Sequence, residues 1–139
     1  MFGHGVGTTR DGIWATRAIV PRAALIDVPA GIDLQRAAVM GVAGVTAWRT
    51  VTELAQVTKD DRVLVLGAAG GVGSIIVSLV HRLGVPVWGR ANDPGSVAWL
   101  QARGADRVVI AGSDALASEI GEFQPTVAFD PLGMVSPVP

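Results

Sequence analysis

The sequence contains no cysteine, no tyrosine and no run of lysine or arginine residues. Without cysteine the chain cannot form disulfides, iron–sulfur sites or thiolate zinc sites, and this composition fits the reducing cytoplasm, where we expect the protein to reside. Cysteine and tyrosine are also common nucleophiles and proton donors in active sites, so their absence removes two candidate types of catalytic residue. The sequence offers no acid–base pair that would identify a catalytic residue. A formal net charge of −1 without a basic cluster argues against a nucleic-acid-binding surface.

Aromatic residues are few, at 5% of 139 residues, whereas half of the chain is hydrophobic and 18 residues are glycine. The core must therefore be aliphatic, which is typical of a parallel sheet covered by helices on both faces. Residues 63–80 carry no charge, but glycines interrupt them, and a membrane span needs roughly 20 mainly apolar residues. We expect a strand, a glycine turn and a helix there, and no membrane partner.

The first part of the chain predicts little regular structure. Residues 13–26 are rich in β-branched and apolar side chains but are interrupted at Pro21, which predicts one or two short extended segments and a turn. Asp33 stands where an N-cap would precede a helix over residues 34–40.

Two glycines, Gly41 and Gly44, are expected to end that helix before a second one over residues 46–57. From residue 58 onward, short apolar segments alternate with helical segments. The predicted strands cover residues 62–66, 85–88, 107–110 and 126–129, and the predicted helices cover residues 72–83, 94–103 and 113–120. The first of these helices has a single apolar stripe, formed by Val72, Ile75, Ile76, Leu79, Val80 and Leu83. The alternation predicts an α/β fold with a doubly wound parallel sheet of the Rossmann type.

The segment GAAGGVG at residues 67–73 lies between the first of these strands and its helix. Gly70 and Gly71 have no side chain to hold a pyrophosphate away from the backbone, and Gly73 would let the helix pack close to the strand. The start of the helix would direct free N–H groups and the positive end of its dipole at the phosphates. A tight turn without a ligand and the S-adenosylmethionine site of a methyltransferase are the alternatives.

The end of the second predicted strand bears on the choice of cofactor. Dinucleotide and S-adenosylmethionine sites usually have an acidic residue there, roughly 20 residues after the turn, which binds ribose hydroxyls. This sequence has GRAN at residues 89–92, and its next carboxylate is Asp93. Arg90 offers a cation where a 2′-phosphate would bind, which favours NADP(H) over NAD(H); a solvated surface arginine is the alternative. Trp88 is interpreted as a packing residue rather than as a flank for an adenine ring.

Four segments occur in a characteristic order and spacing: residues 37–48 (AAVMGVAGVTAW), 61–73 (DRVLVLGAAGGVG), 100–109 and 129–133 (FDPLG). Together they resemble the medium-chain dehydrogenase/reductase superfamily and, within it, the zinc-independent quinone oxidoreductase-like branch. The resemblance implies that residues 1–32 correspond to the end of an N-terminal, GroES-like catalytic domain with short β segments. Residues 33–139 would form an incomplete NAD(P)-binding Rossmann domain.

The resemblance also implies roles for individual residues. Thr46 would contact the cofactor near its nicotinamide ribose or phosphate, and residues 90–92, with Arg90 and Asn92, would meet the adenosine ribose. The pyrophosphate would be held by Ala69, Gly70, Gly71, Val72 and Gly73. Val42 occupies the position of a cysteine ligand in zinc-dependent relatives, so no zinc and no other metal is expected.

The activity that the resemblance implies is transfer of a hydride between NADPH and a small quinone, enone or carbonyl substrate. The alternative is a dinucleotide-binding module from a shortened gene that is inactive alone or depends on a partner. Family members continue past residues 129–133 with two further strands. The last strand of this chain would then leave an open sheet edge, which a second copy or a complementing chain would cover.

Overall fold

The computed structural model describes residues 2–110 and 116–133. It divides the chain into two compact units, one ending at Ala38 and the other beginning at Val39. The helical elements of the first unit are short: 3₁₀ helices η1 (Phe2–Gly5) and η2 (Arg22–Ala24), and the larger part of α1 (Leu34–Met40).

The first unit contains no strand among its described residues, although an isolated β-bridge joins Val6 and Arg10. The short β segments expected within residues 1–32 are therefore wrong, although residues 13–26 do contain the predicted turn, at η2, and extended backbone. The backbone of Leu25 is extended (φ −97°, ψ 138°), but a strand also needs a neighbouring strand to take its hydrogen bonds. The large apolar side chains of this segment are mostly exposed instead, as the fully exposed Trp14 illustrates.

The start of α1 follows the sequence prediction. The Asp33 Oδ1 atom accepts hydrogen bonds from the backbone N–H groups of Gln35 (2.8 Å) and Arg36 (3.3 Å). Asp33 is thus the N-cap of α1, because it satisfies two of the donors that a helix start leaves without an intrahelical acceptor.

Of the two glycines expected to end the helix, only Gly41 does so; it separates α1 from α2 (Val42–Arg49), which continues as a π-helical turn over Thr50–Leu54. Gly44 lies buried inside α2, and the predicted break there is wrong. A Cβ on Gly44 would lie 3.0 Å from Met40 Cε, so the glycine serves close packing of two helices rather than helix termination.

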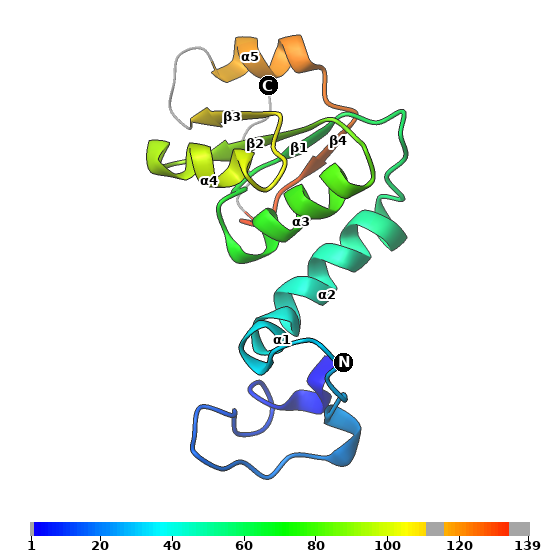
Figure 1. Cartoon of the computed structure of the whole chain (residues 1–139), viewed down its shortest axis with the longest axis vertical. Helices are drawn as coiled ribbons and strands as arrows, with labels where there is room; N and C mark the ends of the chain where they lie inside the picture. Colours follow the sequence, from blue (N-terminus) through cyan, green and yellow to red (C-terminus); the bar gives the residue numbers. More distant parts are fainter. Residues whose placement is uncertain (1, 111–115, 134–139) are drawn as a thin grey trace. The chain divides into compact units, whose positions relative to one another are not determined.

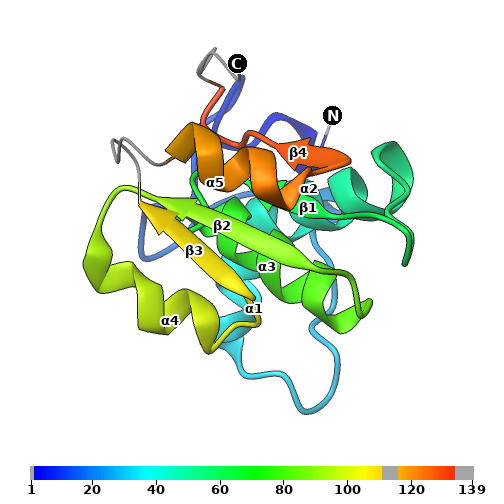
Figure 2. The same ribbon diagram turned by 90° about the horizontal axis from the view of Figure 1, so that it is seen from above.

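The second unit holds a parallel sheet with the strand order β3-β2-β1-β4. Its strands are β1 (Val63–Val65), β2 (Val87–Ala91), β3 (Arg107–Ile110) and β4 (Val127–Phe129). One face of the sheet is covered by α3 (Gly71–Arg82) and α4 (Val97–Gln101), and the other face is covered by α5 (Leu116–Phe123) (Figure 1 and Figure 2). This is the doubly wound α/β arrangement that the sequence predicts. A short 3₁₀ helix, η4 (Pro94–Ser96), precedes α4.

The strand order of the sheet reverses between β1 and β4. The chain runs from β1 to β2 to β3 on one side and then returns through α5 to pair β4 with the free side of β1. Val65 and Phe129, at the carboxyl ends of these strands, are register partners. In open sheets of this kind, ligands bind in the crevice where the order reverses. The glycine turn of residues 67–73 follows β1 at this position.

The buried face of α3 differs from the predicted stripe. The residues of α3 that are buried in the core are Gly73, Ile76, Val77 and Val80. Ile75 and Leu79 are only half-buried on its flank, and Leu83 is 41% exposed. Because a helix lying on a sheet buries only the line of residues nearest to it, the six-residue stripe was too wide, and it omitted Val77.

Strand β2 runs from Val87 to Ala91 rather than over residues 85–88. Pro86 has no N–H to donate, and its carbonyl accepts the Val63 N–H (2.9 Å) just before the strand begins. Arg90 therefore lies within the strand. Helix α5 ends at Phe123, beyond the predicted residue 120, and residues 113–115 of that prediction lie outside the described residues.

Residues 63–80 form β1, the turn and most of α3, so the membrane interpretation was correctly set aside. Over the part of the chain that the structure describes, no helix combines the length and the apolar character that crossing a membrane requires.

The amino ends of β1 and β4 are joined by the Asp61 carboxylate. Asp61 accepts hydrogen bonds from the Thr58 N–H (2.8 Å) and Thr58 Oγ1 (3.0 Å), and from Thr126 Oγ1 (2.8 Å). The Arg62 N–H donates to the same Thr126 hydroxyl (3.0 Å). The Thr58 backbone bond, followed by the Thr126 and Thr58 hydroxyls, lowers the pKa of Asp61, since all of them favour the charged carboxylate.

Because this pKa is lowered on folding, the stabilisation is complete above the ordinary pKa of an aspartate, about 4, and is lost as the pH falls through the lowered value. We expect Asp61→Asn to lower the melting temperature at pH 7 and to lose less stability than the unchanged protein between pH 5 and pH 3. Thermal unfolding followed by circular dichroism measures both. Asp60→Asn, at the exposed neighbouring residue, is the control; equal acid profiles for the two variants would contradict this role of Asp61.

Candidate functional site

The turn after β1 places an uncapped helix N-terminus at the carboxyl edge of the sheet. Gly67 has φ +62°, a left-handed conformation that glycine adopts without strain, and its carbonyl accepts the Gly70 N–H (3.0 Å). Helix α3 begins at Gly71, and Gly70 at the N-cap makes no side-chain capping bond. The N–H groups of Gly71, Val72 and Gly73 have no acceptor within the helix and carry the positive end of its dipole.

Two glycines allow backbone packing that is too close for any side chain. A Cβ on Gly73 would collide with the Gly67 carbonyl and lie 2.9 Å from Ala68 Cα. A Cβ on Gly89 of β2 would lie 2.9 Å from Ala68 Cβ. The Ala68 N–H also donates to the Arg90 carbonyl (2.9 Å). The turn is thus packed between α3 and β2, and this contact confirms the packing that the sequence predicts for Gly73.

The tip of the turn is open to solvent. Its exposed residues are Ala69, Gly70 and Gly71. At the base of the turn, the Leu132 side chain lies against Gly67. Leu132 follows β4, where its N–H donates to Asp130 Oδ1 (3.0 Å). The Asp130 carboxylate therefore has a structural role in the loop that borders the turn.

Helix α2 passes beside the turn, since a Cβ on Gly71 would lie 4.0 Å from Ala43 Cβ. Thr46 is three residues after Ala43, a spacing that places both on the same side of the helix, and its side chain is exposed. Val42 is 74% exposed at the start of α2. Among residues 2–110 and 116–133, no three histidine, aspartate or glutamate side chains gather as a metal-binding group.

Arg90 and Asn92 lie at the carboxyl end of β2. Arg90 is half-buried inside the strand, and Asn92 is exposed just after it. Because side chains alternate along a strand, Arg90 is on the same face as Trp88. The Asp93 carboxylate is engaged in capping η4, where its Oδ1 accepts the Gly95 N–H (3.1 Å).

Trp88 is a packing residue, as the sequence predicts. Its ring stacks on Phe123 of α5, with ring centroids 4.4 Å apart and planes 11° apart. The guanidinium carbon of Arg107, its register partner on β3, lies 4.9 Å from the Trp88 ring centroid. The contacts place the indole in the layer between the sheet and α5.

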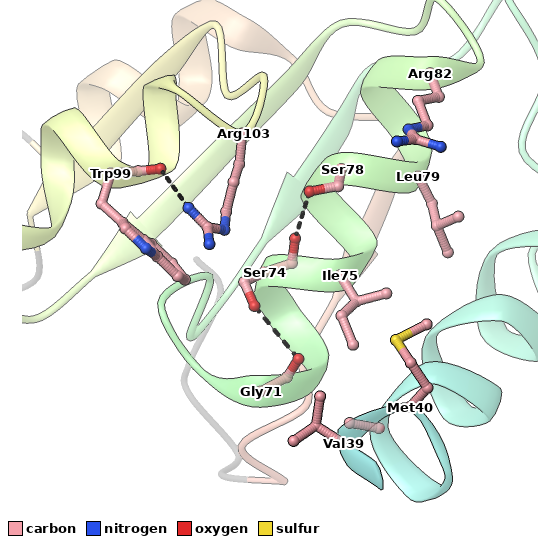
Figure 3. A pocket seen from close by; sticks show the side chains of 11 residues that line it. Val39, Met40, Gly71, Ser74, Ile75, Ser78, Leu79, Arg82, Trp99 and Arg103 are labelled. Atoms are coloured by element: carbon pink, nitrogen blue, oxygen red, sulfur yellow. Dashed lines mark hydrogen bonds between the residues drawn. The ribbon is translucent and has the colours of Figure 1, made fainter. Parts of the chain in front are cut away.

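Sequence reasoning missed a set of residues that carry hydrogen-bonding groups along α3 and on and just after α4: Ser74, Ser78, Arg82, Trp99 and Arg103. They line one groove together with apolar residues (Figure 3). The sequence did contain a pattern that could have revealed them. Ser74, Ser78 and Arg82 are spaced by four residues, which puts three polar side chains in one row on a mostly apolar helix.

No protein-family model matches the chain. Among curated proteins, the chain is 36% identical over 112 residues to the probable acrylyl-CoA reductase AcuI of Escherichia coli, covering 78% of this chain and 35% of that protein. It is 33% identical over 135 residues to the putative quinone oxidoreductase YhfP of Bacillus subtilis, covering 94% of this chain and 41% of that protein.

Solved structures agree with these relatives. The quinone oxidoreductase of Thermus thermophilus, solved also in complex with NADPH, superimposes with a TM-score of 0.77 at 26% identity, over 91% of this chain and 42% of that chain. Escherichia coli YhdH with bound NADPH has a TM-score of 0.69 at 38% identity, over 76% of this chain and 34% of that chain. Over the part of their length that it matches, the chain is similar to these quinone oxidoreductase-like and acrylyl-CoA reductase proteins in both sequence and fold.

This quinone oxidoreductase-like chain spans about two fifths of the length of the curated relatives that it matches. These similarities confirm the resemblance to the quinone oxidoreductase-like branch of the medium-chain dehydrogenase/reductase superfamily that the order of the sequence segments indicates. The glycine turn, the helix carrying Thr46 and the end of β2 all lie in the unit that begins at Val39. Their contacts with a cofactor stay predictions.

Proposed function

We propose that this chain binds NADP(H) at the glycine turn and supplies the cofactor-binding part of an oxidoreductase that acts on a small quinone, enone or carbonyl compound. The observation that carries the proposal is the uncapped, solvent-open N-terminus of α3 at the position where the strand order reverses. Backbone N–H groups and a positive dipole end at such a position fit a pyrophosphate. The NADPH complexes of two structural neighbours support the choice of ligand.

The residues present fit a dinucleotide. The N–H groups of Gly71, Val72 and Gly73 would bind the pyrophosphate, and the exposed Ala69 and Gly70 leave its approach open. Bound NADPH would supply the hydride, while the protein would orient it and exclude competing reactions.

Three further residues would complete the cofactor site. Thr46 would contact the ribose or phosphate on the nicotinamide side, and Arg90 with Asn92 would bind the adenosine end. Two features of β2 and the loop after it support a preference for NADP(H). The guanidinium of Arg90 is a cation that suits the 2′-phosphate, which only NADP(H) carries. The nearest carboxylate, Asp93, which could bind a ribose hydroxyl of NAD(H), accepts the Gly95 N–H instead.

We further propose that the site works without zinc, because Val42 stands where zinc-dependent relatives have a cysteine ligand and a valine side chain cannot bind a metal. Catalytic residues are not assigned, since no described acid–base pair lies at the turn. A cytoplasmic location remains part of the proposal, as does a second copy or complementing chain at the outer edge of β4, which pairs with no further strand among the described residues.

A second candidate function is a dinucleotide-binding module that turns nothing over by itself. It is favoured by the absence of a candidate acid–base pair at the turn among the described residues, because binding needs only the turn whereas turnover needs catalytic groups. Thermal unfolding with NADPH, NADH and S-adenosylmethionine, followed by assays of NADPH oxidation with a quinone and an enone, separates the candidates. We expect NADPH to raise the melting temperature by several degrees and more than the other two ligands. Binding without oxidation favours the module, and no preference for NADPH contradicts the cofactor proposal.

Arg90→Ala tests the cofactor preference directly. Removing the guanidinium should weaken NADPH binding by about tenfold and leave NADH binding nearly unchanged, because a charge-assisted contact to the 2′-phosphate exists only for NADPH. Tryptophan fluorescence titration gives both affinities. Lys59→Ala, which removes a cation at the opposite edge of the sheet, is the matched control. If Arg90→Ala weakens both cofactors equally, the arginine does not select NADP(H).

A further inference from the structure

A groove of about 480 Å³ runs along the outer side of α3, from Gly71 at the end of the glycine turn to Arg82 (Figure 3). This volume is in the range of small-molecule sites. One wall comes from the α1–α2 segment and the other from α4. Its lining residues are Val39, Met40, Ala43, Gly71, Ser74, Ile75, Ser78, Leu79, Arg82, Trp99 and Arg103.

The floor of the groove has two chemically different rows, which follow from helix periodicity. Ser74, Ser78 and Arg82 are spaced by four residues and form a polar row. Ile75 and Leu79 form an adjacent apolar row. Figure 3 shows the apolar row on the side of Met40 and the serines on the side of Trp99 and Arg103. The groove is therefore amphipathic across its width.

The Arg103 guanidinium is held in place before any ligand arrives. Its carbon lies 3.6 Å from the Trp99 ring centroid, and its Nη1 donates to the Trp99 carbonyl (3.4 Å). Both contacts restrict the side chain and leave further N–H donors of the planar group available. A restricted arginine loses less rotamer entropy on binding an anion than a free one.

The charges of the groove have one sign. Arg82 and Arg103 bring two cations, and among the described residues that line the groove none carries a carboxylate. The hydroxyls of Ser74 and Ser78 donate to the backbone carbonyls of Gly71 (3.4 Å) and Ser74 (3.1 Å), so the two arginines, and not the serines, provide the donors for an anion. Charge complementarity thus calls for a ligand with an anionic head.

We propose that this groove is a second binding site, for a small amphiphilic anion. Its carboxylate or phosphate-monoester head binds Arg103, with Arg82 as a second cation. Its short aliphatic body lies over Ile75 and Leu79 against Met40. The groove shares Gly71 with the glycine turn, but the two arginines that would hold the anion lie outside the turn, so the proposal does not depend on whether the turn binds a dinucleotide.

Octanoate and octyl phosphate are the probes, and octan-1-ol is their uncharged counterpart. The readout is the Trp99 indole N–H signal in two-dimensional ¹H–¹⁵N NMR of the whole chain, assigned by its loss in Trp99→Phe. We expect at least one anion to shift this signal in a saturable way and to bind about tenfold more tightly than octan-1-ol. The tighter of the two anions identifies the head group. No shift with either anion, or equal affinity for the alcohol, overturns the proposal.

Two variants test the residues. Arg103→Gln should weaken binding of the anion by about tenfold, whereas Lys59→Gln, which changes the net charge equally outside the groove, should leave it unchanged. Ser78→Phe keeps both arginines but fills the groove and should abolish the shift, which keeps the test decisive if Arg103→Gln does not fold. Binding that survives in Ser78→Phe contradicts the proposed location.

Saturating NADPH distinguishes this site from the turn. The anion should still shift the Trp99 signal with unchanged affinity when NADPH is bound. Displacement of the anion by NADPH overturns the second site and assigns the groove to the dinucleotide. If NADPH does not bind at all, the cofactor proposal fails while the anion titration still tests the groove.

Discussion

Gly73→Ala should destabilise the fold and abolish dinucleotide binding together. The added Cβ would collide with the Gly67 carbonyl and with Ala68 Cα, which are backbone atoms that cannot rotate away. The collision is avoided only if α3 moves away from β1 or the turn of residues 67–73 opens. Overpacking of this kind typically costs about 1–3 kcal/mol and more where backbone must shift. We expect a loss of at least this size in the free energy of unfolding, measured by urea denaturation.

The control for this substitution is Gly121→Ala in α5, where an added Cβ has no neighbour within 4 Å. Alanine is the better helix former by about 0.5–1 kcal/mol, so this variant should be neutral or more stable. It should bind NADPH as the unchanged chain does. Similar stabilities for the two variants would show that close packing at Gly73 does not hold the turn.

Gly89→Ala should destabilise the chain in a way that a second substitution relieves. The new methyl group would lie 2.9 Å from Ala68 Cβ, a contact between two side chains rather than with backbone. We expect a loss of about 1–3 kcal/mol for Gly89→Ala. In the double variant Gly89→Ala/Ala68→Gly the clash disappears, and the two effects should be non-additive by about 1 kcal/mol or more.

Urea denaturation of the four proteins of this cycle gives the interaction free energy. The Ala68 N–H donates a hydrogen bond to the Arg90 carbonyl, so a shift of Ala68 would also disturb the strand end that carries Arg90. NADPH affinity should therefore fall with Gly89→Ala and recover in the double variant. Additive effects on stability would mean that β2 and the turn adjust independently, which contradicts the packed geometry of the site.

The alternation of segments after residue 58 predicted the sheet because each βαβ unit is encoded locally. An aliphatic run such as residues 63–65, a glycine turn and an amphipathic helix have only a few ways to pack. The N-cap at Asp33 was also predictable from local sequence, because the Gln35 N–H that donates to its carboxylate is only two residues away. Gly73 was predictable because strand-to-helix turns of this type need a close approach of two backbones.

Features that depend on distant residues were not predictable. Gly44 looks like a helix breaker until Met40 is seen to fill the space above it. The end of β2 depends on pairing with β3, which carries the strand past Trp88 to Ala91. Residues 13–26 have the composition of strands, but a strand forms only where a partner accepts its hydrogen bonds. The groove requires α4 to lie beside α3, which no local pattern encodes.

The most direct test of the account follows the backbone amides of Gly71, Val72 and Gly73 by ¹H–¹⁵N NMR while NADPH is added to the whole chain. If these groups bind the pyrophosphate, their signals should show the largest shifts in the chain and saturate with the affinity found by fluorescence. Saturation of the protein with NADPH while these three signals stay in place would contradict the central claim, because the phosphates would then be bound elsewhere.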